Sequence, residues 1–373
     1  MRIQDVEFIG LRSSLPQPAN FSWGAATARN VGLVKVTTDD GLVGYGETSV
    51  TFPLWSLEER ALTVREGLRP LVLGADTDDI AGLHAQLQRT FARLGPLWSP
   101  LAIHSSIGAF EMALWDLKGK AERKPLYQVL NPQATAEPIP LYAVGFTGDP
   151  DAMARQAAAA LDDGFAAVKV RLGFGEERDL ALLNVMRSTL GDSATLLADA
   201  NMAWTRHVAA AMADRLTAFR LGWLEEPLDR GDIIGLAELR RASGIPIAAG
   251  ENAYGVHEGL ALIAADAVDI IMPDIARGGG IIAARGMIAA ARAKGLPYSL
   301  HHYASDLGFA AALHLCTAEP GAMYLLRDTS PWPLRSDLLV DALRIAGGRA
   351  WPPDGAGLGI TLDEGVIEQY RIV

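Results

Sequence analysis

The sequence contains almost no cysteine and no long hydrophobic run. Cys316 is the only cysteine among 373 residues, so the chain can form neither an internal disulfide nor a cysteine-based metal site. Apolar stretches such as residues 310–313 stay far below the roughly 18 residues that cross a bilayer. Residues 1–7 alternate apolar and polar positions and do not have the pattern of an export signal. We therefore expect a cytoplasmic protein that does not insert into membranes.

Positive charge is also scarce. Lys and Arg total 33 against 44 Asp and Glu, a formal net charge of −11, and no segment is rich in Lys or Arg. Nucleic acids and other polyanions are therefore not expected as partners. Half of the residues are hydrophobic, which predicts a large folded core. At about 150 residues per domain, the length predicts two or three domains, or one large α/β unit with additions.

The first 132 residues are predicted to form an α+β lobe. Residues 31–38 and 42–47 read as strands on either side of the turn Asp39-Asp40-Gly41, which predicts a β-hairpin. From residue 57 to 130 the apolar period changes to about 3.6, as expected for helices. The loop at 131–133 marks the predicted end of this lobe.

After residue 136, short β-branched strands alternate with helices rich in Ala, Leu and Arg. This alternation predicts a barrel of βα units over residues 133–335. An open doubly wound sheet is the alternative, but it would normally carry a glycine-rich loop after its first strand, and none follows residues 142–144. Residues 336–373 are turn-rich, end in a predicted short strand and are expected to return to the first lobe. The eight predicted barrel strands are 139–145, 166–171, 195–200, 221–225, 246–250, 268–273, 297–301 and 322–327.

Carboxylates stop three consecutive strands of this predicted barrel. Asp199, Glu225 and Glu251 are each 26 residues apart, one βα unit at a time, so they should lie side by side at the carboxyl rim, where barrel enzymes keep their chemistry. A single strand-end acid more often caps a helix or pairs with Arg. Three together repel one another, and an all-oxygen set suits a hard divalent ion. We predict one Mg²⁺ per subunit, with Mn²⁺ as the second choice.

Further polar residues close the neighbouring strands. Asp274 and His301 end the sixth and seventh strands, where the acid can orient the imidazole as a base. His302 competes with His301 for this role. Lys169 and Arg171 alternate with Val170, so both should point into the barrel mouth, where they could simply balance the acids.

These motifs together resemble the mandelate racemase and muconate lactonizing enzyme group of the enolase superfamily, in particular its mandelate racemase-like branch. The resemblance covers nearly the whole chain. The motifs that carry it are the helix 107–120 followed by Pro125-Leu126-Tyr127, the pair 169/171, Asp199-x-Asn201, Glu225-Glu226-Pro227, Gly250-Glu251-Asn252, Pro273-Asp274 before the glycines at 278–280, and His301.

The resemblance implies an α/β fold, a (β/α)7β TIM-like barrel with an N-terminal α+β capping domain that the C-terminal segment completes. It implies Asp199, Glu225 and Glu251 as Mg²⁺ ligands, and Glu226 is not carried over as a ligand. The catalytic residues would be Lys169, Arg171, Asp274 and His301. Capping loops 16–30 and 48–55 would select the substrate, with Trp23, Phe52 and Trp55 as contacts, and Asn201 and His302 would also face the substrate. Members of the group are usually symmetric oligomers, so we expect a dimer or an octamer.

Two departures from the family pattern bear on the reaction. Where racemases of this group carry a second lysine, this chain has Arg171, a poor proton acceptor. Leu326 stands about where mandelate racemase has a Glu that contacts the substrate carboxylate. The resemblance therefore favours a Mg-dependent hydro-lyase that removes the α-proton of a sugar acid and then water, giving a 2-keto-3-deoxy acid. Alternatives are epimerisation or cycloisomerisation through the same enolate, with Lys169 or His301 as the base, and a barrel without catalytic activity.

Overall fold

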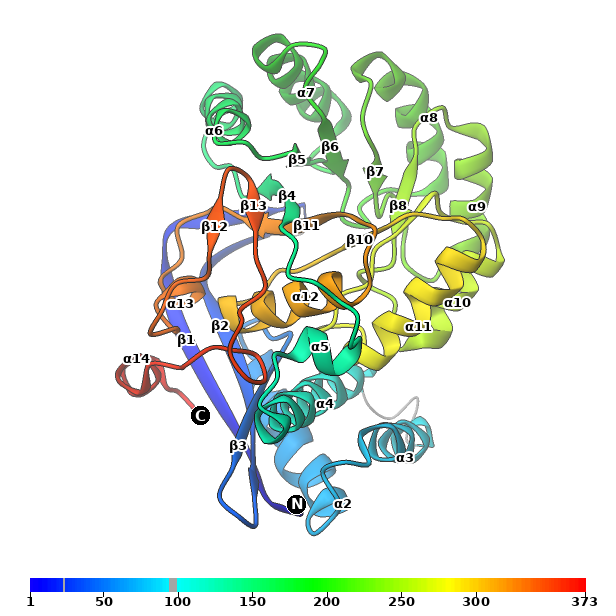
Figure 1. Cartoon of the computed structure of the whole chain (residues 1–373). Helices are drawn as coiled ribbons and strands as arrows, with labels where there is room; N and C mark the ends of the chain where they lie inside the picture. The colour runs from blue at the N-terminus through cyan, green and yellow to red at the C-terminus, as the bar shows by residue number, and fades with distance from the viewer. Residues whose placement is uncertain (23, 94–98) are drawn as a thin grey trace.

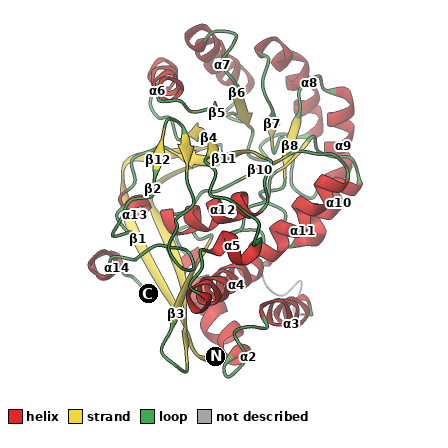
Figure 2. Ribbon diagram, viewed as in Figure 1, coloured by secondary structure: helices red, strands yellow, loops and turns green. Residues whose placement is uncertain are grey.

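The computed structural model describes residues 1–22, 24–93 and 99–373. Figure 1 shows two parts, a barrel built from the middle of the chain and a lobe formed by the N-terminal sheet and helices. In Figure 2 the barrel strands are surrounded by helices, while the long strands of the lobe lie to one side.

The barrel consists of eight parallel strands in chain order, closed by pairing of the last strand with the first. This confirms the predicted fold class, and each of the eight strands predicted from the sequence is present. The strands are β4 (Ile139–Val144), β5 (Ala167–Arg171), β6 (Leu196–Asp199), β7 (Leu224–Glu225), β8 (Ile247–Ala249), β9 (Ile270–Ile271), β10 (Tyr298–Leu300) and β11 (Ala322–Asp328).

A helix follows each of the first seven barrel strands. Several of these helices begin at an Asp, Ser or Thr whose side chain accepts an amide N–H of the first turn, as at Asp149, Thr205, Asp232 and Ser305. None of the described helices is long and apolar enough to cross a membrane. The helices are α6 (Pro150–Asp162), α7 (Glu176–Leu190), α8 (Arg206–Leu216) with the 3₁₀ turn η3 (Thr217–Phe219), α9 (Ile233–Ala242), α10 (Val256–Ala264), α11 (Gly280–Ala293) and α12 (Asp306–Ala318).

The capping lobe combines a three-stranded antiparallel sheet with a helical layer. Its strands pair in the order β1-β2-β3, and the predicted hairpin is present as β2 and β3. The strands are β1 (Ile3–Phe21), β2 (Gly24–Thr38) and β3 (Val43–Thr48). The helices are α1 (Ser56–Leu62), the π-helical η1 (Thr63–Leu68), α2 (Arg69–Val72), α3 (Ile80–Ala92), α4 (Pro100–Glu122) and α5 (Leu126–Leu130).

The predicted loop at 16–30 is wrong for most of its length. β1 and β2 continue as a two-stranded arm in which Ala19 pairs with Ala26 and Phe21 with Gly24. The register is irregular between Ser14 and Ala19, the stretch that contains two prolines, which cannot donate to the ladder. Main-chain pairing beyond this irregularity restores the strands.

Two glycines bring β3 against α4. A Cβ atom on Gly46 would lie 2.0 Å from the carbonyl oxygen of Ala109, and one on Gly44 would lie 2.3 Å from that of Ala113. Only glycine therefore fits at these positions, which alternate with Tyr45 on the strand. The Gly-Tyr-Gly motif serves close packing of the sheet on the helix.

The C-terminal segment differs in part from its prediction. It ends in a helix, α14 (Glu364–Tyr370), not in a strand, and the Ile372 amide then donates to the Gly10 carbonyl of the lobe. Before this helix come the short α13 (Pro333–Ser336) and two short strands, β12 (Ile345–Ala346) and β13 (Arg349–Ala350). β13 pairs with barrel strand β4, as Figure 1 shows, so the segment contacts both parts. The boundaries at residues 132 and 335 remain predictions.

Glu47, at the end of β3, ties the lobe to the barrel. Its carboxylate accepts the amides of Ser305 and Gly308 at 2.9 Å each and the Ser305 hydroxyl at 2.7 Å. Glu47 thus accepts hydrogen bonds from backbone N–H groups at the amino end of α12, which have no partner within the helix. Burial raises the pKa of Glu47 to about 7. The contact fixes the chain just after β10.

His314 of α12 is a second link between the parts. The Tyr127 amide donates to its Nδ1 at 3.2 Å, so Nε2 carries the hydrogen and donates to the Leu358 carbonyl at 3.1 Å. The ring is fully buried, and burial lowers its pKa to about 4. One neutral imidazole therefore joins the barrel, α5 and the C-terminal segment.

We predict that His314 makes the protein acid-sensitive. Because its pKa is about 4 when folded and about 6.5 when unfolded, protonation favours the unfolded chain as pH falls below about 6.5. At pH 5 this costs about 2 kcal/mol relative to neutral pH. Urea unfolding followed by circular dichroism should show this loss between pH 7 and pH 5. His314→Gln can keep both hydrogen bonds but does not titrate. Its free energy of unfolding should therefore fall by about 2 kcal/mol less than that of the wild type between pH 7 and pH 5. Equal losses in the two proteins would contradict the prediction.

Candidate active site

Three buried carboxylates lie at the carboxyl ends of neighbouring barrel strands. In the parallel register, Arg171 pairs with Asp199 and Asp199 with Glu225. Glu251 follows β8, two residues beyond its last strand residue. The three acids are at most 4% exposed. The equal spacing in the sequence therefore corresponds to neighbouring positions at one rim of the barrel.

Lys169 joins two of these acids. Its Nζ lies 3.2 Å from Oδ2 of Asp199 and 2.5 Å from Oε1 of Glu225. Burial alone would lower the pKa of Lys169, but these carboxylates outweigh it and the pKa is raised. The other oxygen of Glu225 accepts the indole N–H of Trp223 at 3.0 Å. Burial, together with Asp199 and Glu251, raises the pKa of Glu225 to about 8.

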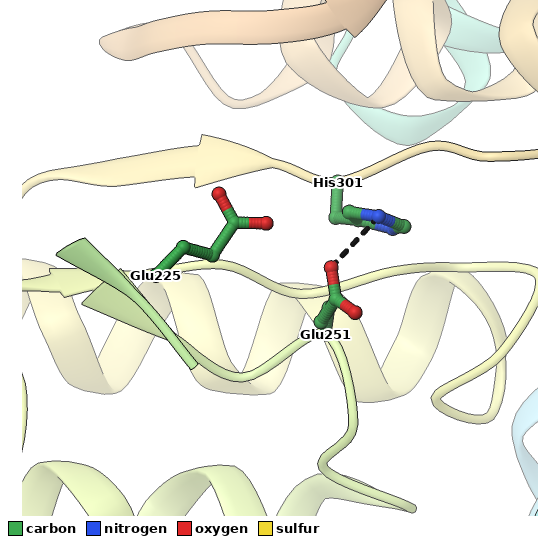
Figure 3. A group of neighbouring side chains, drawn as sticks. All are labelled: Glu225, Glu251 and His301. Carbon is green, nitrogen blue, oxygen red and sulfur yellow. Dashed lines mark ion pairs between the residues drawn. The ribbon is translucent and has the colours of Figure 1, made fainter. Parts of the chain in front are cut away.

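Glu251 lies between two other cationic side chains. Its Oε1 is 2.8 Å from Nη1 of Arg277, and its Oε2 is 2.7 Å from Nε2 of His301. Burial would raise the pKa of Glu251, but His301 and Arg277 hold it well below its usual value. Figure 3 shows the His301 and Glu251 side chains meeting, with Glu225 beside them. Ligand atoms of these three residues lie within 4.8 Å of one another.

Asp274 and His301, the pair expected to act as a dyad, lie in contact. Nδ1 of His301 lies 2.6 Å from Oδ2 of Asp274, whose other oxygen accepts the amides of Ala276 and Arg277. Burial opposes the charge on His301, but Glu251 and Asp274 outweigh it and raise its pKa to about 9. The imidazole is therefore a cation in this arrangement, although the sequence suggested a base that is neutral near pH 7.

His302 and Glu226 adjoin His301 and Glu225 in the sequence, but their side chains make other contacts. His302 contacts the Ser305 carbonyl through Nε2 at 3.0 Å and lies beside the Phe309 ring. Burial lowers the pKa of His302 to about 4. Glu226 accepts the Gly250 amide at 3.0 Å. The structure thus does not bring His302, a predicted substrate contact, to the cavity with His301.

A cavity of about 240 Å³ lies over the acids. Lys169, Arg171, Asn201 and Phe52 line it, and so does Leu326. The catalytic and substrate-binding roles expected of the first four stay predictions. Trp23, another predicted contact, lies outside the described residues. Trp55 is 65% exposed and is not among the described residues that line the cavity.

Arg171 is held by aromatic rings from both parts of the molecule. Its guanidinium carbon lies 4.3 Å from the centre of the Phe21 ring of the β1 arm and 5.2 Å from that of Tyr303, which follows β10. Arg29, from β2, forms a buried ion pair with Asp328 at 2.6 Å and also contacts the Tyr303 hydroxyl.

Sequence reasoning missed Arg29, Tyr303 and Arg277's pairing with Glu251. Two signals were present. Arg29 is a charged residue next to a hydrophobic strand, and Tyr303 follows His301 by two positions. Neither signal identifies the partner, because the partners come from distant parts of the chain.

Both parts of the chain match known families. Residues 6–131 match the mandelate racemase / muconate lactonizing enzyme N-terminal domain, and residues 152–366 match the enolase C-terminal domain-like family.

Curated relatives span most of the chain. An L-talarate/galactarate dehydratase of Salmonella typhimurium is 32% identical over 79% of this chain and 71% of its own length. A D-galactarolactone cycloisomerase of Agrobacterium fabrum is 29% identical over 91% of each chain. These two names stand for different reactions, elimination of water and isomerisation.

Solved structures agree along the whole chain. An enolase superfamily member from Polaromonas sp. JS666 superposes with a TM-score of 0.92 at 31% identity, covering 100% of this chain and 98% of its own. An L-talarate dehydratase from the same organism, complexed with Mg and L-glucarate, gives 0.86 at 27% identity with the same coverage. The chain therefore belongs to the mandelate racemase and muconate lactonizing enzyme group of the enolase superfamily.

Proposed function

We propose that this protein removes the proton α to the carboxylate of a sugar acid and then eliminates the β-hydroxyl as water, giving a 2-keto-3-deoxy acid. The observation that carries this proposal is that, among the described residues, one imidazole lies at the acid cluster. His301 is oriented by Asp274 at 2.6 Å and lines the cavity. One base that takes one proton suits an elimination.

The other basic side chains have different tasks. Lys169 is bound to Asp199 and Glu225 and lines the cavity, so its positive charge can meet the substrate carboxylate. Arg171 is a poor proton acceptor. Burial would lower the pKa of Arg171, but Tyr303 and nearby acids raise it. Because the pKa values of Lys169 and Arg171 are both raised, neither is suited to take a proton, and inversion at the α-carbon is disfavoured.

The acid cluster fits a divalent cation. Its oxygens form a hard donor set, and they are buried, with Oε2 of Glu251 paired to Nε2 of His301 at 2.7 Å. Asp199, Glu225 and Glu251 would hold Mg²⁺. A bound Mg²⁺ would supply positive charge that stabilises an enolate dianion and would balance the charge of Glu251. In its neutral form His301, with Nδ1 held by Asp274, would accept the α-proton at Nε2.

The relatives support this reaction but include a second one. They include an L-talarate/galactarate dehydratase and a D-galactarolactone cycloisomerase. Isomerisation therefore remains the main competing outcome of the experiment below.

We predict that the purified protein with Mg²⁺ converts at least one mono- or diacid sugar to a 2-keto-3-deoxy acid. Proton NMR in D₂O against a library of such acids measures both loss of substrate and exchange at the α-carbon. His301→Asn should lower the rate by at least about 10²-fold, because a general base contributes about 10²–10⁴-fold. Exchange or isomerisation without water loss in the wild type would overturn the dehydratase proposal.

We also predict which side chains bind the cation. Two ligand sets are compared: Asp199, Glu225 and Glu251, or Glu225, Glu251 and His301. Glu225 and Glu251 belong to both sets, so variants of Asp199 and His301 tell them apart. If Asp199 is a ligand and His301 the base, Asp199→Asn should weaken Mg²⁺ binding by about 100-fold or more, since losing even an outer-shell partner costs about 10–100-fold. His301→Asn should bind Mg²⁺ nearly as well as the wild type. Isothermal titration calorimetry gives both affinities.

Glu226→Gln is the matched control for this titration. The residue adjoins Glu225, but its carboxylate accepts the Gly250 amide, so the substitution should leave Mg²⁺ affinity almost unchanged. Loss of affinity in His301→Asn with retention in Asp199→Asn would reverse the assignment of ligand and base.

A further inference from the structure

Tyr303 stands at the wall of the cavity. It comes two residues after His301 and lines both the cavity above the acids and an adjoining one of about 120 Å³. Lys169 and Arg171 line the same two cavities. The Tyr303 side chain is therefore within the space available to a substrate that lies over the acids.

Two guanidinium groups converge on the Tyr303 hydroxyl. Nη2 of Arg29 donates a hydrogen bond to its oxygen, and Arg171 forms a side-chain hydrogen bond with it. A guanidinium can only donate, while a phenol offers two lone pairs and one proton. Both contacts therefore use the lone pairs of the oxygen. Its own proton remains for a third partner, and no described residue accepts it.

The ring is fixed in place by the same two arginines. The guanidinium carbon of Arg29 lies 4.5 Å from the ring centre and that of Arg171 5.2 Å from it. Arg29 is anchored by its buried ion pair with Asp328 at 2.6 Å. Arg171 packs on Phe21. These contacts hold the hydroxyl at the cavity wall with its proton unused.

We propose that Tyr303 is the proton donor for the departing β-hydroxyl, an inference that rests on the proposed dehydration. The α C–H bond breaks, its proton goes to Nε2 of His301, and its electron pair moves into the carboxylate to form the enolate. When the enolate collapses, an electron pair forms the Cα–Cβ double bond. The Cβ–O bond breaks, and its oxygen takes the Tyr303 proton and leaves as water.

The remaining steps restore the enzyme. The resulting enol loses its hydroxyl proton to solvent and gains one at Cβ, which gives the 2-keto-3-deoxy acid. The proton on His301 is returned through solvent to the Tyr303 phenolate. The net change is loss of one water, with no oxidant or reductant.

The surrounding charge suits this role. When the proton leaves, the phenolate faces two guanidinium groups, and such preorganised positive charge stabilises it. Arg29 is neutralised by Asp328, but Arg171 forms no ion pair within the described residues, so its charge is available to the phenolate. A separate donor also allows His301 to keep the α-proton while the hydroxyl leaves.

The test is Tyr303→Phe, which keeps the ring contacts and removes only the hydroxyl. With Mg²⁺ and a sugar acid that the wild type dehydrates, kcat for dehydration should fall by about 10²–10⁴-fold, while KM stays close to that of the wild type. Exchange of the α-proton in D₂O, which needs only His301, should persist. A 3-deoxy-3-fluoro analogue, whose leaving fluoride needs no proton, should eliminate at nearly the wild-type rate.

Two controls separate this role from a structural one. Tyr324→Phe removes a hydroxyl from a tyrosine that packs on Tyr142 and Trp223 inside the barrel, and it should leave the rate unchanged. A structural defect in Tyr303→Phe would lower exchange, fluoride loss and water loss together, and that result would overturn the inference, as would unchanged dehydration. If the wild type dehydrates no sugar acid, the proposed function itself fails.

Discussion

The ion pairs of Lys169 with Asp199 and Glu225 hold the acid cluster together. Two like charges about 4 Å apart repel by about 4 kcal/mol at an effective dielectric constant of 20, and these carboxylates are buried. Lys169 on one side and Arg277 with His301 on the other supply the opposing charge. Leaving one partner of such a buried pair alone costs about 3–5 kcal/mol. The rim of the barrel is therefore built around charge balance, and the same balance makes it suitable for an anionic substrate.

The capping lobe completes this site by bringing charge from far along the chain. Glu47 fixes the amino end of α12 and with it the segment that follows His301. Arg29 reaches Asp328, at the end of the last barrel strand. Both contacts are buried and join residues more than 250 positions apart in the sequence. Closure of the cavity and the position of Tyr303 thus depend on the same contacts between the two parts.

The sequence predicted the barrel well because its signal is local and repeated. Each strand is a short apolar run, and most of them are followed by a polar residue, so the pattern predicted all eight strands, and the 26-residue spacing placed the acids at one rim. The arm at 16–30 was missed because Pro16 and Pro18 indicate a loop, whereas pairing beyond them is set by the partner strand. The final helix was missed because the turn-rich segment before it carries little periodicity.

The sequence by itself determined the order of elements, the family resemblance and the identity of the acids, lysine and histidine at the strand ends. Only the tertiary structure decided how these groups share charge: that Glu251 pairs with both Arg277 and His301, and that His302 faces α12. It also decided that Arg29 and Arg171 meet at the Tyr303 hydroxyl. The physical reason is that charge state and hydrogen bonding depend on burial and on distances between atoms. Those distances are set by closure of the barrel and docking of the lobe, not by spacing along the chain.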